Sequence, residues 1–302
     1  MAKRSKKNYK RVQSPLKWHG GKYYLAKPIV QLMPPRSVNP SAPKKDDKGW
    51  VHYVEPFFGG GQVLFANDPE GISEVVNDID GQLANFWNVL RSDSTRDKFI
   101  GLANLTPVDS DLFKHAKQVL ETKEDLSAES LDVECALLFF IKYRQSRQAL
   151  GESFSTFSSN RSRSGMNEQV SSWLGVVEGL NEAADRLRRV AIVSDDAITV
   201  IKREDGPRTL FYLDPPYLQS TRVSKEAYKH EMTLEQHEEL LKTAESLEGR
   251  FMLSGYRSEL YDDYALKNKW RLVEINAVLN SSSKREKETR VECVWMNYEG
   301  SK

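Results

Sequence analysis

The chain of 302 residues is long enough for one sizeable α/β domain with a smaller second domain inserted or appended. Its 44 Lys and Arg residues are almost balanced by 43 Asp and Glu residues, so the overall charge favours no class of partner. The sequence has no run of about 18 apolar residues, and its basic start is not followed by an apolar signal core, so we expect a cytoplasmic protein without membrane spans. Cys135 and Cys293 lie far apart, which argues against a disulfide framework and against a zinc site.

Six of the first eleven residues are Lys or Arg, and this segment contains no acid and almost no apolar residue. A segment of this composition does not bury enough apolar surface to fold by itself. We therefore expect residues 1–14 to form a disordered basic tail.

Seven short apolar runs bounded by turn-forming residues predict β-strands. These strands are expected at Val51–Val54, Glu74–Asn77, Val190–Ser194, Thr209–Leu213, Arg250–Ser254, Trp270–Ile275 and Val291–Met296. Several of them adjoin segments of helical periodicity, which cover Gly61–Asn67, Ile79–Arg91 and Thr233–Ser246. Strands that alternate with helices form βαβ units, so the sequence predicts an α/β fold with a mostly parallel sheet.

The middle of the chain, from about residue 94 to 188, has a different pattern. Helical periodicity covers Asp111–Glu121, Leu131–Lys142 and Gln169–Leu187. We expect no strand between these helices, and a helical segment that interrupts a βαβ series is typical of an inserted domain. We therefore predict one domain built from residues 15–93 and 189–302, and a second, mainly helical domain built from residues 94–188.

The stretch Tyr143–Glu168 inside this helical segment is rich in Ser and Gly. By composition alone it is equally typical of a solvated loop. Phe154 and Phe157, interleaved with hydroxyl and guanidinium groups, favour a surface that contacts nucleic acid. The basic side chains of this stretch are Arg144, Arg147, Arg161 and Arg163.

The predicted strand Thr209–Leu213 runs directly into Asp214, Pro215, Pro216 and Tyr217. Ligands of open α/β sheets bind at the carboxyl ends of strands, so we expect chemistry at this loop. Two consecutive prolines fix the backbone and remove two N–H donors, which leaves a rigid turn whose acceptors are its carbonyls and the Asp214 carboxylate. A Pro-Pro turn with a buried tyrosine is the purely structural alternative.

The predicted strand Val51–Val54 is followed by Glu55, Phe57 and three consecutive glycines at 59–61. Glycines between a strand and a helix allow positive φ and the close approach of a ligand, as a nucleotide-binding loop requires. At the end of the next strand stands Asp78, an acid placed to accept hydrogen bonds from ribose hydroxyls. An ordinary turn with a helix-capping aspartate would give the same pattern.

A third cluster, residues 15–22, precedes the first strand and contains Trp18, a Gly-Gly pair and Lys22. It has the composition of a flexible loop on a basic tail. In the functional alternative, Trp18 packs on a cofactor, and Lys22 meets the carboxylate of that cofactor or Asp214 itself.

The three clusters, in this order and with a helical insertion before the last, resemble the Dam-like family of DNA adenine methyltransferases over residues 15–297. The resemblance implies a Rossmann-like methyltransferase fold with a mixed seven-stranded sheet, in which the inserted segment recognises the target. It implies S-adenosylmethionine as methyl donor and double-stranded DNA as partner, without a metal. A cognate restriction endonuclease that acts on the same site is a further partner expected on this basis.

The resemblance also assigns roles to residues. The expected cofactor-binding positions are Trp18, Lys22, Glu55, Phe57, Gly59, Gly61, Asp78, Asp196 and Asp214. In the expected reaction, an adenine flipped out of the duplex stacks on Tyr217. The Asp214 carboxylate and the Pro215 carbonyl then accept from its 6-amino group and stabilise the charge that grows there. Contacts to DNA are expected from Arg144, Arg147, Arg161 and Arg163.

Three features depart from the family pattern: His19 stands where a small residue is usual, three glycines at 59–61 replace a more usual Gly-Ala-Gly, and Ser254–Tyr256 replaces a Ser-Asn turn. The last departure leaves the floor of the base pocket unassigned. The nearest alternative is the same fold acting on a cytosine 4-amino group, on RNA adenine or on a glutamine amide. Similar enzymes that act on cytosine tend to begin the motif with Ser, and those that act on glutamine with Asn, so Asp214 favours adenine. A non-catalytic DNA-binding relative is the second alternative.

Overall fold

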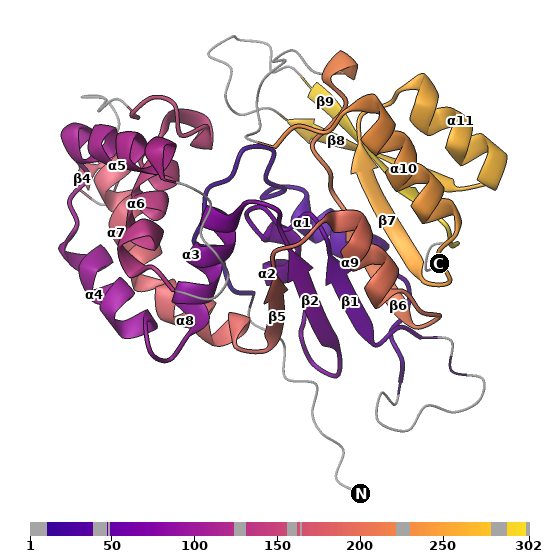
Figure 1. Ribbon diagram of the computed structural model, residues 1–302, viewed down its shortest axis with the longest axis horizontal. Coiled ribbons are helices and arrows are strands. Elements are labelled where there is room, and N and C mark those ends of the chain that lie inside the picture. Colours follow the sequence, from indigo (N-terminus) through magenta and orange to yellow (C-terminus); the bar gives the residue numbers. More distant parts are fainter. Residues whose placement is uncertain are drawn as a thin grey trace, which may run out of the picture.

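The computed structural model describes residues 11–38, 47, 49–123, 131–155, 162–163, 165–221, 230–278 and 289–299. Most of the expected basic tail, together with Phe157 and Arg161, lies outside these residues. The described chain forms a seven-stranded sheet with helices on both faces and a helical segment beside one edge (Figure 1). Among the described residues, no helix is both long and apolar enough to cross a membrane.

All seven predicted strands are present and belong to one sheet. They are β1 (His52–Glu55), β2 (Ser73–Asn77), β5 (Val190–Val193), β6 (Thr209–Leu213), β7 (Arg250–Gly255), β8 (Arg271–Val278) and β9 (Thr289–Met296). Their order in the sheet is β5-β2-β1-β6-β7-β9-β8. The first five are parallel, while β9 is antiparallel to both β7 and β8. This is the mixed seven-stranded sheet that the family resemblance implies.

Successive residues of the central strands enter different hydrophobic clusters because side chains alternate between the two faces of a strand. Along β6, Leu210 and Tyr212 belong to one cluster, and Phe211 and Leu213 belong to the other. Both faces of the sheet are therefore buried, which explains why the parallel strands read as continuous apolar runs in the sequence.

Each face of the sheet is covered by helices. One face packs against α1 (Ala26–Leu32), α2 (Gln62–Ala66) and α3 (Gly81–Arg91). The other face packs against α9 (Ala197–Glu204), α10 (Leu234–Glu245) and α11 (Glu259–Asn268). The predictions for α2, α3 and α10 are confirmed, and α10 begins with a capping box formed by Thr233 and Gln236.

The helical segment consists of α4 (Arg96–Leu105), α5 (Ser110–Thr122), α6 (Val133–Arg144), α7 (Glu168–Glu178) and α8 (Leu180–Leu187). Two expectations for it are wrong. The single helix expected at 169–187 is two helices, because Gly179 ends α7 and begins α8. The expectation of no strand also fails, since Ser162–Arg163 (β3) pairs with Met166–Asn167 (β4) around Gly165, whose φ is +73°.

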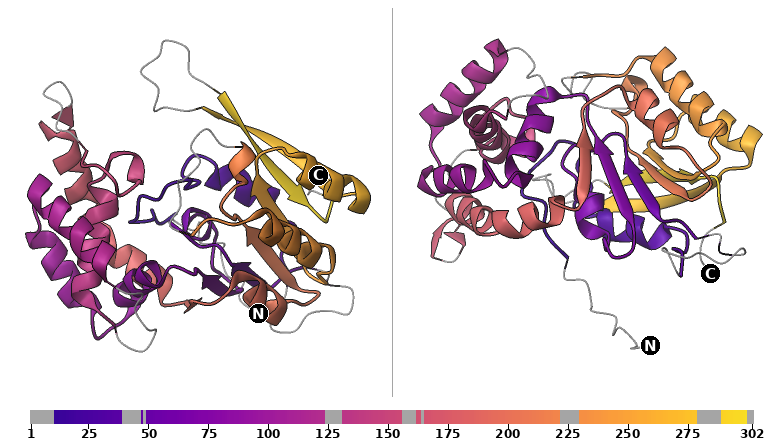
Figure 2. Two further views of the ribbon diagram at one scale, coloured as in Figure 1. Left: turned by 45° about the horizontal axis from the view of Figure 1, so that its top comes forward. Right: turned by 60° about the horizontal axis from the view of Figure 1, so that its bottom comes forward.

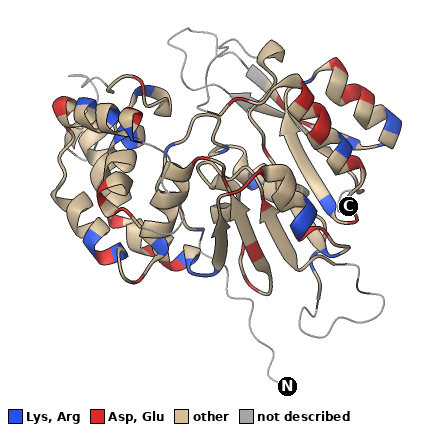
Figure 3. Cartoon of the chain, viewed as in Figure 1, with Lys and Arg blue, Asp and Glu red and all other residues tan. Residues whose placement is uncertain are grey.

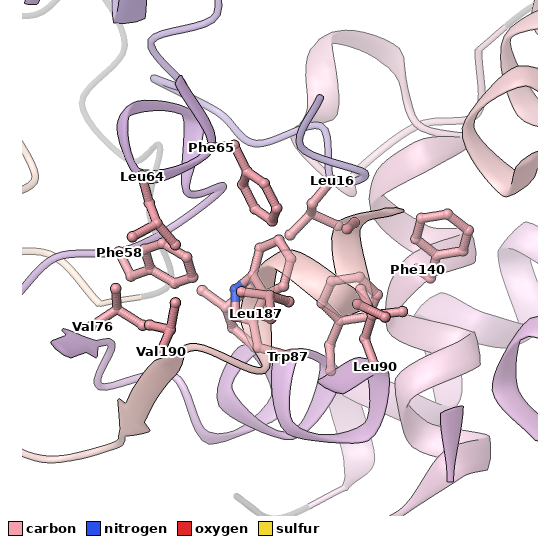
Figure 4. Packing of buried hydrophobic residues seen from close by; sticks show 14 of the residues in the cluster. Leu16, Phe58, Leu64, Phe65, Val76, Trp87, Leu90, Phe140, Leu187 and Val190 are labelled. Atoms are coloured by element: carbon pink, nitrogen blue, oxygen red, sulfur yellow. The ribbon is translucent and has the colours of Figure 1, made fainter. Parts of the chain in front are cut away.

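One continuous core joins the helical segment to the sheet (Figure 4). The rings of Phe86 in α3 and Phe140 in α6 stack with their centroids 5.7 Å apart. Trp87 and Leu187 belong to the same cluster. Figures 1 and 2 show the helical segment beside the β5 edge of the sheet, with β8 at the opposite edge. Because the core is shared, the division at residues 93/94 and 188/189 stays a prediction.

Candidate active site

A cavity of about 1010 Å³ lies at the carboxyl ends of β5, β2, β1 and β6. Glu55 at the end of β1 lines this cavity, as do Asp78, Asp196 and Asp214 in the loops after β2, β5 and β6. Tyr143 of α6 lines it from the helical segment. The strand order reverses at β1, with β2 on one side and β6 on the other. This is the kind of switch point at which open α/β sheets bind ligands.

Asp214 is held by two donors that reach the same oxygen. Lys22 Nζ lies 2.8 Å from Asp214 Oδ1, and the Tyr217 hydroxyl donates to Oδ1 at 3.2 Å. Both of these contacts are made to Asp214 Oδ1. The Asp214 side chain is 17% exposed and lines the cavity together with Pro215 and Pro216. Two donors therefore orient the carboxylate through Oδ1.

Tyr217 is turned inward rather than towards open solvent. It is 8% exposed, and its hydroxyl donates to Glu292 as well as to Asp214. The ammonium of Lys22 lies 4.9 Å from the centre of its ring, and Tyr256 packs edge-on against it at 4.8 Å. The replaced Ser-Asn turn therefore places an aromatic ring beside Tyr217, while the Ser254 hydroxyl is paired with the Tyr212 hydroxyl at 2.9 Å.

Lys22 reaches Asp214 because the preceding loop folds back on itself. Gly20 has φ +71°, and Gly21 N donates to Trp18 O at 3.1 Å. The Lys22 ammonium donates to Gly20 O at 3.0 Å, and the Lys22 side chain is 7% exposed. Of the two alternatives for Lys22 in the functional interpretation, the structure contains the contact with Asp214.

Trp18 is the packing centre between this loop, the glycine loop and α6. Its ring lies 4.7 Å from that of Tyr143 and 6.0 Å from that of Phe139. A Cβ atom on Gly59 would stand 2.8 Å from Trp18 Cδ1, and one on Gly60 would stand 2.7 Å from Trp18 Cβ. The glycines are therefore required in part by the close approach of Trp18.

The glycine loop and Asp78 form one unit. Gly59 and Gly61 have φ values of +48° and +64°. Gly59 N donates to Asp78 Oδ2 at 2.8 Å, and Asp80 N donates to Oδ1 at 3.1 Å. Burial raises the pKa of the Asp78 carboxyl to about 6, and these backbone donors act in the opposite direction. Helix α3 is capped by Asp80, so the alternative of Asp78 as its cap is wrong.

The remaining predicted cofactor residues also lie at the cavity wall. Glu55 is buried, and Tyr53 donates to its Oε1 at 2.5 Å. Burial raises the pKa of the Glu55 carboxyl to about 8. Asp196 lines the cavity, but its carboxylate caps α9 by accepting from Thr199 N at 2.9 Å. Phe57 lines the cavity and packs against the core beneath α9 and α10.

The predicted DNA-contacting arginines have different environments. Arg144 donates to the carbonyl and hydroxyl oxygens of Ser172 in α7, both at 3.2 Å, and burial lowers its pKa to about 10. Arg147 and Arg163 are exposed, whereas Arg161 lies outside the described residues. Phe154 packs on Phe113 of α5 at 5.8 Å. In Figure 3 basic and acidic residues are interspersed over the molecule. A charged partner would therefore be bound by a local group of side chains and not by the overall charge of the protein.

Glu292 is a site residue that sequence reasoning missed. It lies in β9, is 5% exposed, and approaches Lys22 Nζ to 3.5 Å while accepting from Tyr217. The signal was present as a carboxylate in the middle of an apolar strand, between Val291 and Cys293. Among the described residues, no group of three or more His, Cys, Asp or Glu side chains is placed to hold a metal ion.

Comparison with known proteins gives one positive finding. Residues 18–275 match the family of D12 class N6 adenine-specific DNA methyltransferases. A search of curated proteins found no match. The matched span begins at Trp18 and includes Lys22, Asp78 and the loop at 214–217, but it ends before β9 and Glu292.

Proposed function

Because the chain belongs to the family of D12 class N6 adenine-specific DNA methyltransferases and is therefore an enzyme that methylates adenine in DNA, we propose the reaction in finer detail. The methyl group comes from S-adenosylmethionine and is transferred to the 6-amino group of an adenine flipped out of the duplex. The observation that carries this proposal is the meeting of Asp214, Lys22 and the unit of Gly59 and Asp78 in one cavity.

The residues of the cavity suit S-adenosylmethionine. Asp78 supplies a carboxylate for the ribose hydroxyls, and the glycine loop lets backbone approach the ligand. Trp18 and Phe57 supply apolar surface, and the cavity of about 1010 Å³ is large enough for a nucleoside and a base together. When bound, this cofactor supplies an activated methyl group on a sulfonium, so the protein itself needs to supply orientation and acceptors.

Asp214 and Pro215 are the proposed acceptors for the target amine. The lone pair of an exocyclic amine is delocalised into the purine ring, so the amine is a weak nucleophile. Asp214 Oδ2 and the Pro215 carbonyl can accept its two protons and favour a tetrahedral nitrogen. Pro215 and Pro216 carry no N–H donors, and their rings hold the turn in one conformation.

Tyr217 is proposed to stack on the flipped base, which would offset part of the cost of unstacking, roughly a few kcal/mol. In the structure the Lys22 ammonium lies over the Tyr217 ring at 4.9 Å. Stacking on that face therefore requires Lys22 to move away from the ring. The cofactor carboxylate is a suitable further partner for the Lys22 ammonium, in addition to Asp214 and Glu292.

For the DNA-contacting surface we propose Arg147, Arg163 and, outside the described residues, Arg161. Arg147 and Arg163 are exposed on the stretch that connects α6 to α7. Arg144, by contrast, donates hydrogen bonds to Ser172. We propose that this contact stabilises the conformation of the stretch and that Arg144 does not contact DNA. A restriction endonuclease with the same recognition site remains a proposed partner.

The test is transfer of a labelled methyl group to duplex DNA, followed by sequencing of the product for modified bases. Wild-type protein should label adenine, and Asp214→Ala should abolish transfer while cofactor binding falls only in part. Asp263→Ala, an exposed aspartate in α11, is the matched control and should remain active. Transfer that survives in Asp214→Ala, or label found on cytosine, would refute the proposal.

A further inference from the structure

The register of β9 places Glu292 beside Lys22, a residue of the cavity wall. Ser254 of β7 pairs with Val294, and Met252 pairs with Met296. Val294 and Met296 belong to the cluster that also contains Tyr212, whereas Cys293 and Trp295 belong to the cluster on the opposite face. Since side chains alternate along a strand, Glu292 lies on the face that carries Lys22 and Tyr212.

The Glu292 carboxylate contacts the same two groups that hold Asp214. Its Oε1 accepts from the Tyr217 hydroxyl and lies 3.5 Å from Lys22 Nζ. Those two donors also reach Asp214 Oδ1. Lys22 and Tyr217 are thus each shared between two carboxylates, one from the loop after β6 and one from β9.

A buried carboxylate is costly unless it is paired. Burial raises the pKa of Glu292, and the ammonium of Lys22 acts in the opposite direction. Glu292 is 5% exposed and the Lys22 side chain is 7% exposed, so little water screens their attraction. An apolar residue at this position of the strand would avoid the cost of burying a charge. We therefore look for the role of the carboxylate in its contacts with Lys22 and Tyr217.

Sharing changes the charge that Asp214 presents. Without Glu292, both Lys22 and Tyr217 would direct their protons to Asp214 alone and weaken it as an acceptor. With Glu292 present, the Lys22 ammonium interacts with two carboxylates. The Tyr217 hydroxyl likewise lies between the Asp214 and Glu292 carboxylates. The two donors hold Asp214 Oδ1 in a defined position, and the Asp214 carboxylate lines the cavity.

We propose that Glu292 is a positioning residue for methyl transfer, which shares Lys22 and Tyr217 with Asp214 and so keeps one Asp214 oxygen as the acceptor for the target amine. This inference rests on the proposed function. It assigns to Glu292 no direct contact with the reacting atoms. Its action passes through Asp214 and Tyr217.

The test compares Glu292→Gln with Glu274→Gln, a matched change on the neighbouring strand β8, where Glu274 pairs with Arg257 in a more exposed position. Single-turnover methylation of duplex DNA, the KM for S-adenosylmethionine and the Tm are measured for each. Glu292→Gln should lower the single-turnover rate by about tenfold or more, since a buried donor loses its charged acceptor. The KM should stay within about twofold. Glu274→Gln should match wild type in rate and KM.

Two further variants separate positioning from mere stability. Glu292→Asp retains the charge and should recover part of the rate, and it also serves where Glu292→Gln fails to fold. In a Tyr217→Phe background, Glu292→Gln should have a smaller effect than in wild type because the shared contact is already gone.

The inference is overturned if Glu292→Gln lowers the Tm while the folded fraction keeps the wild-type rate, or if the effects of Glu292→Gln and Tyr217→Phe simply multiply. These outcomes leave the proposed function intact, because wild-type protein would still label adenine. Failure of wild type to label adenine would instead refute the proposed function itself.

Discussion

Lys22 Nζ lies 2.8 Å from Asp214 Oδ1, and this ion pair fastens the loop before α1 to the loop after β6. The two side chains are 7% and 17% exposed. Removing one member of such a pair leaves a charge in a poorly hydrated place, which costs more than the loss of an ion pair at the surface.

Lys22→Met should lower the free energy of unfolding by about 3 kcal/mol, because Asp214 and Glu292 lose the cation that they share. Urea denaturation gives this number directly. Lys27→Met, an exposed lysine on α1, is the control and should change stability by less than about 0.5 kcal/mol. Equal midpoints for the two variants would contradict the importance of the pair.

The glycine loop allows the steric contact with Trp18 to be separated from backbone strain. Gly59→Ala combines a φ of +48° with a Cβ 2.8 Å from Trp18, whereas Gly165→Ala has a φ of +73° and meets no atom of the described residues within 4 Å. Gly165→Ala should therefore cost about 1–2 kcal/mol, and Gly59→Ala clearly more. Gly60→Ala, which meets Trp18 Cβ at 2.7 Å without a positive φ, isolates the clash. Thermal unfolding would rank the three, and equal losses for Gly59 and Gly165 would show that Trp18 gives way freely.

Cofactor affinity should depend on pH through Asp78. The pKa of its carboxyl is raised to about 6, so the charged form that accepts from two hydroxyls is present above that pH and is lost as the pH falls through it. If the proposed cofactor binds only the charged form, its affinity at pH 5 should be about tenfold weaker than at pH 8. Isothermal titration across this range measures the effect.

Asp78→Asn should bind the cofactor weakly and with little change between pH 5 and pH 8. Asp263→Asn on α11 should keep the wild-type dependence. A wild-type affinity that is flat across this range would remove Asp78 from the proposed cofactor site.

The salt dependence of DNA binding distinguishes surface arginines from Arg144. Replacing Arg147 or Arg163 by Ala should weaken binding and reduce the slope of log K against log salt by roughly one unit each, as expected for lost phosphate contacts. Arg144→Ala should instead lower the Tm, because its guanidinium holds Ser172. Fluorescence anisotropy in a salt series measures the slopes, and unchanged slopes for Arg147 and Arg163 would make that stretch an ordinary solvated loop.

The strands and the centre of the site could be predicted from the sequence for a simple reason. A parallel strand is buried on both faces, so each of the five parallel strands appears as a short apolar run. The carboxyl ends of these runs carry Glu55, Asp78 and Asp214, and the topology of the sheet then brings the three to one cavity.

What could not be predicted depends on short elements and on register. Helices α1 and α9 have 7 and 8 residues, which is too short for clear periodicity, and the hairpin of β3 and β4 has two residues in each strand. Gly179 divides α7 from α8 without any change in the apolar pattern. Glu292 stands in a correctly predicted strand, but only the pairing of β9 with β7 shows which face its side chain occupies.

Strand β9 lies between β7 and β8 in the sheet but is the last strand to be synthesised. Ribosomes make the chain from Lys22 towards Glu292, and until β9 has been synthesised β7 has an unpaired edge. Tyr298, just beyond β9, donates to Leu32 O at the end of α1. This hydrogen bond links the C-terminal part of the sheet to the first helix of the chain. A nascent chain that ends before β9 therefore lacks the Glu292 carboxylate that contacts Lys22 and Tyr217.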